Sequence, residues 1–263
     1  MTDTAHTPLD LAHAAMESAP HDDAARLRFY ERLADAELFL LLTEEARDEN
    51  LSPELFELTD AAFVLAFDRE ERLAAFTGRA AAYAALSGRV IAGLCAGQGI
   101  GLGVNLDVAP SSILIPPDAL EWLAETLTHG PKEEQARISE LHPPKGLPES
   151  LLMGLDAKLA TAMGLARSAY LVGVTYDGGG RGHLLGFIDP KQGAETALAK
   201  AVSEALTFSG VEAGALDVGF FNAADPMAAA LARNGLRYDL PEPKQPAARP
   251  APGSDPAKPP ILK

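Results

Sequence analysis

The chain has 263 residues, of which 47% are hydrophobic, and its formal net charge is −15. This composition is typical of a globular protein with an apolar core. So large a negative charge predicts no nucleic-acid partner, because phosphates would be repelled, and no anionic membrane partner. The single cysteine, Cys95, excludes an intramolecular disulfide and a zinc site built from cysteines.

The negative charge is concentrated in the first half of the chain. Residues 1–130 hold 22 acidic and 8 basic residues, whereas residues 131–263 hold 15 and 14. This asymmetry predicts two units with different surfaces. The acidic surface of the first unit is either a docking face for a partner or a solvated face that keeps the protein soluble.

Residues 1–130 predict an α/β domain with leading helices. Thr7 is a suitable N-cap and Pro8 a suitable first helical residue. The spacing of apolar residues along the chain then distinguishes the expected helices from the expected strands. In chain order we expect helices over 8–18 and from 21–23 onward, strands over 38–42 and 61–67, a helix capped by Asp68 and reaching residue 76, a helix over 79–96 broken at Gly88, strands over 100–106 and 112–115, and a helix over 117–127.

Residues 131–240 predict a second domain, of α+β type, with a small mixed sheet and its helices packed on one face. Glycines at 178–180 provide a tight hairpin turn. The expected elements are strands over 135–141, 168–176 and 183–188, helices over 148–163 and 191–208, and a final strand–helix–strand over 216–221, 226–233 and 236–238.

The ends of the chain carry no further domain signal. Residues 241–263 contain eight of the twenty prolines and few large apolar residues, which predicts a disordered or polyproline-like tail. The first residues lack the basic and apolar parts of a signal peptide. The longest uncharged stretch, 90–106, is too short and polar to cross a bilayer. We therefore expect a cytoplasmic protein.

Glycines alternate between Gly97 and Gly103, and this run is the strongest candidate for a binding segment. A dinucleotide fingerprint needs glycines at its first, third and sixth positions, between a strand and a helix. Counted from Gly97 the sixth position is Leu102, and counted from Gly99 it is Val104, so neither is glycine. A helix is expected before the run, where the fingerprint needs a strand. Nucleotide binding is not expected. Close backbone packing is one explanation, and the alternative is a ligand site formed by Gly99, Gly101, Gly103 and Asn105.

No side chains are spaced as a catalytic or metal-binding set. Cys95 lies among apolar residues, as buried thiols do. His13 and Glu17 share one helix face but lack the second pair that a metal site needs. Adjacent carboxylates such as Glu70 and Glu71 are common at solvated helix ends. We expect no catalytic residue, no metal and no cofactor.

The hydrophobic pattern of the chain resembles the SseB family. The resemblance to the family's N-terminal domain rests on Phe63-Val64-Leu65-Ala66-Phe67, Leu73-Ala74-Ala75-Phe76, Gly101-Leu102-Gly103-Val104-Asn105 and Ile115-Pro116-Pro117-Asp118-Ala119-Leu120. Residues 148–238 are similar to its C-terminal domain. Asn105 is followed by Leu106, where the family commonly has proline. The resemblance implies two tandem α/β domains in a bacterial cytosolic protein, no established activity, and a link to serine metabolism through the family's serine-sensitivity phenotype.

These observations favour a non-catalytic binding or adaptor protein, with a protein partner on the acidic first domain. One alternative is a small-molecule-binding regulator whose ligand lies near residues 97–105 or between the domains. Another is an enzyme of unrecognised type, which would need polar groups that converge in one pocket.

Overall fold

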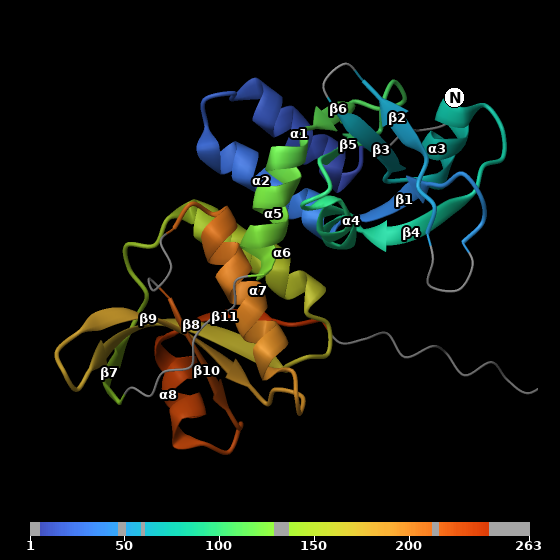
Figure 1. Cartoon of the computed structure of the whole chain (residues 1–263). Coiled ribbons are helices and arrows are strands. Elements are labelled where there is room, and N and C mark those ends of the chain that lie inside the picture. Colours follow the sequence, from blue (N-terminus) through green and yellow to red (C-terminus); the bar gives the residue numbers. More distant parts are fainter. Residues whose placement is uncertain (1–5, 47–50, 59–60, 129–136, 212–215, 242–263) are drawn as a thin grey trace, which may run out of the picture.

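The computed structural model describes residues 6–46, 51–58, 61–128, 137–211 and 216–241 (Figure 1). Within these residues the chain forms eight helices and eleven strands, and the strands make two mixed sheets. The predicted α/β class is confirmed. The expected domain boundary at residue 130 lies outside the described residues, as does the expected tail, 241–263, apart from Pro241. We call each sheet with its helices a domain.

The first sheet has the strand order β4-β1-β3-β5-β6, with β2 also paired to β3. β3 and β5 run parallel, and the other pairs are antiparallel. β1 and β2 share one edge of β3, since β1 pairs with its end and β2 with its start. The strands are β1 (Glu37–Leu41), β2 (Leu55–Glu57), β3 (Ala62–Phe67), β4 (Tyr83–Ser87), β5 (Ile100–Val104) and β6 (Ile113–Ile115).

Helices cover both faces of this sheet because its central strand is apolar on both sides. Val64 and Ala66 of β3 pack under α1, α2, α4 and α5, whereas Leu65 and Phe67 face α3. The side chains of a strand alternate between faces, so an uninterrupted apolar run is buried twice. The helices are α1 (Pro8–Ser18), α2 (Asp23–Asp35), α3 (Glu70–Thr77), α4 (Gly88–Cys95) and α5 (Pro117–Thr128).

The second sheet has the order β10-β9-β8-β11, with β7 also paired to β8. Its centre is the hairpin of β8 and β9, closed by a turn in which Gly179 has φ of +80°. β10 runs parallel to β9. The strands are β7 (Ile138–His142), β8 (Ser168–Tyr176), β9 (Arg181–Ile188), β10 (Asp217–Phe221) and β11 (Leu236–Asp239).

The expectation that all helices of the second domain share one face is wrong. α6 (Glu149–Thr161) and α7 (Glu195–Phe208) pack on one face of the sheet, and α8 (Pro226–Asn234) packs on the other (Figure 1). The reason is again a strand with two apolar faces: Leu171 of β8 lies under α6 and α7, and Val172 faces α8.

Two further expectations for the first domain are wrong. The alanine-rich residues 79–87 do not form a helix, because β4 pairs along the whole length of β1; this pairing outweighs the helix propensity of alanine. Asp68 does not cap α3, whose cap residue is Arg69. The Asp68 carboxylate instead accepts hydrogen bonds from Thr7 and Arg72. The short strand β2 was not predicted.

Leu155 allows a test of the second core. Its side chain is fully buried beneath α7, so Leu155→Ala should lower the free energy of unfolding by about 2–5 kcal/mol. Met153 lies on the same helix with 57% exposure, and Met153→Ala should change it by less than ~0.5 kcal/mol. Equilibrium denaturation of both variants measures the difference, and equal losses would contradict the assigned faces of α6.

The two domains contact each other mainly through α2 and α7. Phe208, the last residue of α7, is fully buried in the core of the first domain. Its ring meets Trp122 edge-on, with centroids 6.4 Å apart. The core of the first domain therefore includes a side chain from the second.

Candidate functional site

The four predicted ligand-binding residues lie together along β5. Gly99 precedes the strand in a turn with φ of +68°, and Asn105 follows it with φ of +49°. A methyl group added to Gly101 would lie 2.4 Å from the Phe63 ring, and one added to Gly103 would lie 2.6 Å from Leu65. Neighbouring side chains thus occupy the space beside both strand glycines, which explains why these positions need glycine. Ligand binding here stays a prediction.

Asn105 belongs to a buried polar network, the α1–α3 network, at the ends of β3 and β5. Its Oδ1 accepts a hydrogen bond from the Asp68 amide, and its Nδ2 donates to Ser111 Oγ at 2.8 Å. Arg72 donates two hydrogen bonds to Asp10, the shorter being 2.5 Å, and one to Asp68 at 2.8 Å. The network joins α1, α3 and the sheet.

The carboxylate of Asp10 is the centre of this network. Burial alone would raise its pKa, but hydrogen bonds from Arg72, Ser111 and the Thr7 amide hold the pKa well below its usual range. All of these groups are buried. The α1–α3 network therefore stabilises the fold.

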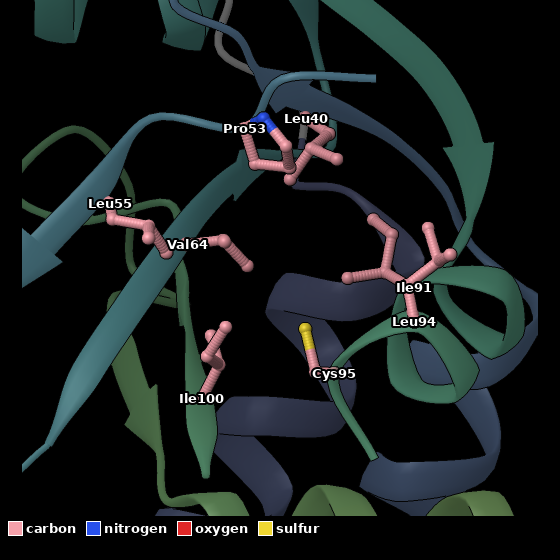
Figure 2. A pocket seen from close by; sticks show the side chains of 8 residues that line it. All are labelled: Leu40, Pro53, Leu55, Val64, Ile91, Leu94, Cys95 and Ile100. Atoms are coloured by element: carbon pink, nitrogen blue, oxygen red, sulfur yellow. The ribbon is translucent and has the colours of Figure 1, made fainter. Parts of the chain in front are cut away.

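An apolar hollow of about 140 Å³ opens on the first domain beside Cys95 (Figure 2). It lies between α4 and the strands β1, β2, β3 and β5. Among the side chains that line it, the only polar atom is the sulfur of the Cys95 thiol. The lining residues are Leu40, Pro53, Leu55, Val64, Ile91, Leu94, Cys95 and Ile100. With the weakly hydrogen-bonding thiol as its one polar group and no charged group, the hollow suits an apolar group.

The thiol in this hollow is not activated. Burial raises the pKa of Cys95 to about 11, so at neutral pH the sulfur is protonated and a poor nucleophile. Across the part of the chain that the structure describes, His, Cys, Asp and Glu side chains form no group of three that could hold a metal ion. The same part has no helix of the length and apolarity that crossing a bilayer requires.

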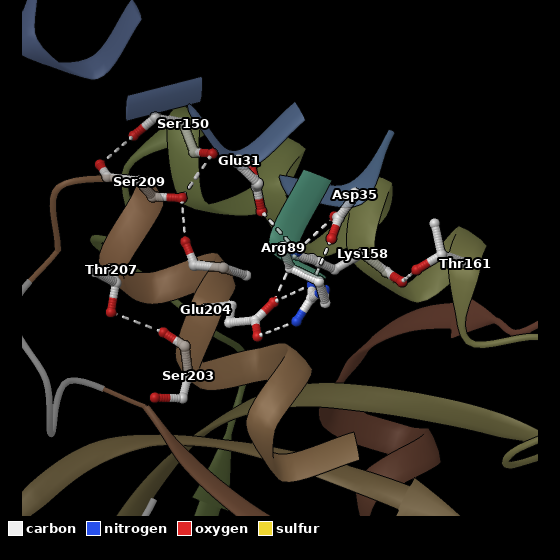
Figure 3. A network of polar contacts seen from close by, with 11 residues as sticks. Glu31, Asp35, Arg89, Ser150, Lys158, Thr161, Ser203, Glu204, Thr207 and Ser209 are labelled. Carbon is white, nitrogen blue, oxygen red and sulfur yellow. Dashed lines mark hydrogen bonds and ion pairs between the residues drawn. The ribbon is translucent and has the colours of Figure 1, made fainter. Parts of the chain in front are cut away.

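A cluster of charged side chains joins the two domains (Figure 3). Lys158 of α6 donates to Asp35 of α2 at 2.5 Å and to Glu204 of α7 at 2.9 Å. Arg89 of α4 contacts the same two carboxylates, at 2.6 Å to Asp35 and 3.0 Å to Glu204. Glu31 of α2 lies 3.7 Å from the Lys158 nitrogen. We call these five residues the interdomain charge cluster.

The carboxylates of the interdomain charge cluster differ in their protonation. Burial would raise the pKa of Glu204, but the hydrogen bonds from Arg89 and Lys158 lower it. Burial raises the pKa of Glu31 to about 7, and the attraction of Lys158 only partly opposes this. Glu204 is thus ionised at neutral pH, whereas burial shifts the titration of Glu31 toward neutral pH.

Beside this cluster, α1 and α2 of the first domain and α6 of the second form a groove of about 310 Å³. Arg28 and Arg32 lie on its α2 side. The groove is also lined by Glu31 of α2, and its remaining wall is apolar, formed by Pro8, Leu11, Ala12, Ala15, Ala25, Met153, Gly154 and Ala157. The groove combines cationic and apolar surface between the domains.

Residues 11–122 match the family model of the SseB protein N-terminal domain. Residues 11–122 are thus an SseB N-terminal domain. The match ends in α5, so an SseB C-terminal domain in residues 131–240 stays a prediction. No curated protein and no solved structure matches the chain.

The SseB domain contains every residue that lines the apolar hollow. Of the interdomain charge cluster it contains Glu31, Asp35 and Arg89, and the second domain supplies Lys158 and Glu204. The hollow is therefore a property of the SseB domain itself, while the charge cluster needs both domains.

Sequence reasoning missed the interdomain charge cluster, although a signal was present. Lys158 follows Leu151 by seven residues and Leu155 by three, so it lies on the apolar face of α6. A charged residue on a buried helix face needs an opposite charge nearby. This pattern indicates a buried ion pair but does not identify the partner.

Proposed function

We propose that this protein is a non-catalytic binding protein of the cytosol, and that its SseB domain receives an apolar side chain of a partner protein in the hollow beside Cys95. The observation that supports this proposal is the hollow's lining, which offers apolar contact and, apart from the protonated thiol of Cys95, no group for acid–base or metal chemistry. An apolar cavity of about 150 Å³ holds a benzene molecule, so a hollow of about 140 Å³ fits one leucine-sized or phenyl side chain.

The surroundings of the hollow favour a protein over a free hydrocarbon. Leu55 and Leu94 at its rim are more than half exposed, and exposed leucines around a pocket are typical of a contact surface. The first 130 residues hold 22 acidic and 8 basic residues, so a partner segment with basic residues beside its apolar anchor would be attracted.

Leu94→Glu tests this proposal, because it places a charge at the rim without disturbing the core. Leu94 is 51% exposed, so stability should change by less than ~0.5 kcal/mol. Loss of one buried leucine contact, about 1.5–3 kcal/mol, should weaken partner binding roughly tenfold to a hundredfold. Quantitative affinity capture from lysate, followed by titration of the captured protein in purified form, measures the change.

The control is Leu114→Glu, which makes the same change on β6 at a leucine of 44% exposure outside the hollow. A true partner should bind this variant as it binds the wild type. When the partner is titrated into the wild-type protein, the methyl resonances of Ile91 and Ile100, which line the hollow, should also shift. If no captured protein distinguishes the two variants, the proposal fails.

A second candidate is a small-molecule-binding regulator, favoured by the groove between the domains. Arg28 and Arg32 could hold a carboxylate, and the apolar wall could hold the remainder of a small organic acid. Amino acids, serine included, are the first ligands to test by thermal shift. A ligand at a hundredfold excess over its Kd stabilises by ~2.7 kcal/mol. Arg32→Gln should abolish that shift, and a shift that survives the substitution would place the ligand elsewhere.

A further inference from the structure

The interdomain charge cluster is unbalanced. It contains three carboxylates, those of Glu31, Asp35 and Glu204, and only two cations, those of Arg89 and Lys158. Both cations contact Asp35 and Glu204, so these four groups are paired. Glu31 is the surplus acid, and its ionisation would leave the domain contact with one uncompensated negative charge.

The geometry of Glu31 supports this assignment. Its side chain is 8% exposed, and its Oε1 atom is buried without a hydrogen-bond partner. The nearest cation, Lys158 Nζ, is 3.7 Å away and directs its hydrogen bonds to the other two carboxylates. A buried carboxylate oxygen without a hydrogen bond disfavours the charged form of the group and is tolerable when the group is protonated.

Charged groups surround Glu31 from each element packed around it. On α2 itself Asp35 opposes ionisation and Arg32 favours it, while Lys158 of α6 favours it and Glu204 of α7 opposes it. Arg89 of α4 donates its hydrogen bonds to Asp35 and Glu204.

The remaining neighbours do not supply a partner. Arg28 of α2 lies in the groove and pairs with Asp22. From α1, His13 contacts the Phe29 ring and Asp10 binds Arg72. Among the residues that the structure describes, Glu31 thus has one cation within 4 Å, and Asp35 and Glu204 share that cation.

We propose that Glu31 makes the docking of the two domains proton-dependent, with the docked arrangement holding the Glu31 proton and the separated arrangement releasing it. When the domains part, the Glu31 side chain loses its cover from α6 and α7 and is exposed to water. Docking is then coupled to uptake of one proton, and rising pH weakens the contact. The proposal is independent of what the apolar hollow binds.

The direction and range of the effect follow from linkage. Burial in the docked state raises the pKa of Glu31 from 4.5 to about 7. Docking is therefore unaffected by this group below about pH 4.5, weakens as the pH rises toward 7, and levels off above that value. One proton changes the docking equilibrium by at most tenfold per pH unit, so a change on the order of tenfold is expected between pH 5.5 and 7.5.

Glu31→Gln removes the titration and keeps the shape of the side chain. The readout is amide hydrogen exchange along α2 and α7, reported at each pH as the ratio of wild type to variant, so that the intrinsic pH dependence of exchange cancels. This ratio should change about tenfold between pH 5.5 and 7.5, with the wild type relatively less protected at the higher pH. The emission of Trp122, which contacts Phe208, should follow the same midpoint.

The control is Glu121→Gln, which removes an exposed carboxylate of α5 in the same domain. Its ratio to wild type should stay constant with pH. A constant ratio for Glu31→Gln, or an equal change for the control, would overturn the proposal. Should Glu31→Gln fold poorly, carbon-13 NMR of the wild type decides: a Glu31 carboxyl midpoint near pH 7 supports the proposal, and one near 4.5 refutes it.

Discussion

Arg72→Ala should lower the free energy of unfolding by about 3–5 kcal/mol, the loss expected when one partner of a buried ion pair is removed. Arg72 is the cation of the α1–α3 network, and it donates to Asp10 and to Asp68. The side chains of these two acids are 1% and 5% exposed. Without the guanidinium, two carboxylates would remain buried with hydroxyl and amide donors only.

The pH dependence of this deficit identifies its cause. The paired Asp10 has a depressed pKa, so the pair contributes stability above about pH 4, the ordinary range for an aspartate, and loses it as the pH falls further. In Arg72→Ala the unpaired Asp10 carboxylate can take up a proton more readily. Urea denaturation should therefore show a deficit that shrinks between pH 5 and pH 3.

Arg26→Ala is the matched control for Arg72→Ala. Arg26 also pairs with an aspartate, Asp23, at 2.8 Å, but the two side chains are 56% and 79% exposed. An exposed pair contributes at most about 1 kcal/mol. Similar losses in the two variants would contradict the conclusion that burial, and not the pairing alone, makes the Arg72 contacts important.

Lys158→Met should lower the free energy of unfolding by about 3 kcal/mol at pH 7.5, because Asp35 and Glu204 would then share the single cation Arg89. Methionine fills most of the volume of the lysine stem, so the loss reports charge more than packing. Denaturation monitored by circular dichroism and by the emission of Trp122 measures it. The deficit should decrease at pH 5, because the loss of Lys158 removes one of the two cations that lower the pKa of Glu204, which can then take up a proton more readily.

A double variant isolates the ionic part of this effect. Lys158→Met combined with Asp35→Asn removes one acid along with the cation, so it should be more stable than Lys158→Met alone, with a coupling on the order of 1–3 kcal/mol. Lys191→Met, at an exposed lysine, should change stability by less than ~0.5 kcal/mol. Additive losses in the double variant would show that Lys158 acts through packing.

Local signals in the sequence predicted much of the secondary structure. Thr7 caps α1 and is followed by Pro8, and Asp22 caps α2. Each of these signals lies within a few residues of the turn that it stabilises, so a single chain segment reveals it. The SseB resemblance of the first domain, which rested on the same hydrophobic pattern, is confirmed by the family match.

Features that depend on distant residues were not predictable in the same way. The strand β4 forms because β1, more than forty residues earlier, offers an edge for pairing. The helix propensity of alanine is a local property and carries no information about that distant edge. Arg72 and Asp10 are 62 residues apart, and Lys158 and Asp35 are 123 apart. Sequence can mark a charge on an apolar helix face, but only the fold shows which opposite charge it meets.

The position of Phe208 has a consequence for how the chain folds as it leaves the ribosome. The SseB domain is translated first, yet its apolar interior stays incomplete until the end of α7 has been made, about eighty residues after α5 ends at Thr128. N-terminal domains generally fold first during translation, but the core of this domain is complete only after Phe208 has been translated. A gene fragment ending at residue 128 would encode a domain with a cavity at the position of the Phe208 ring. Filling that cavity would be the first step in stabilising the fragment.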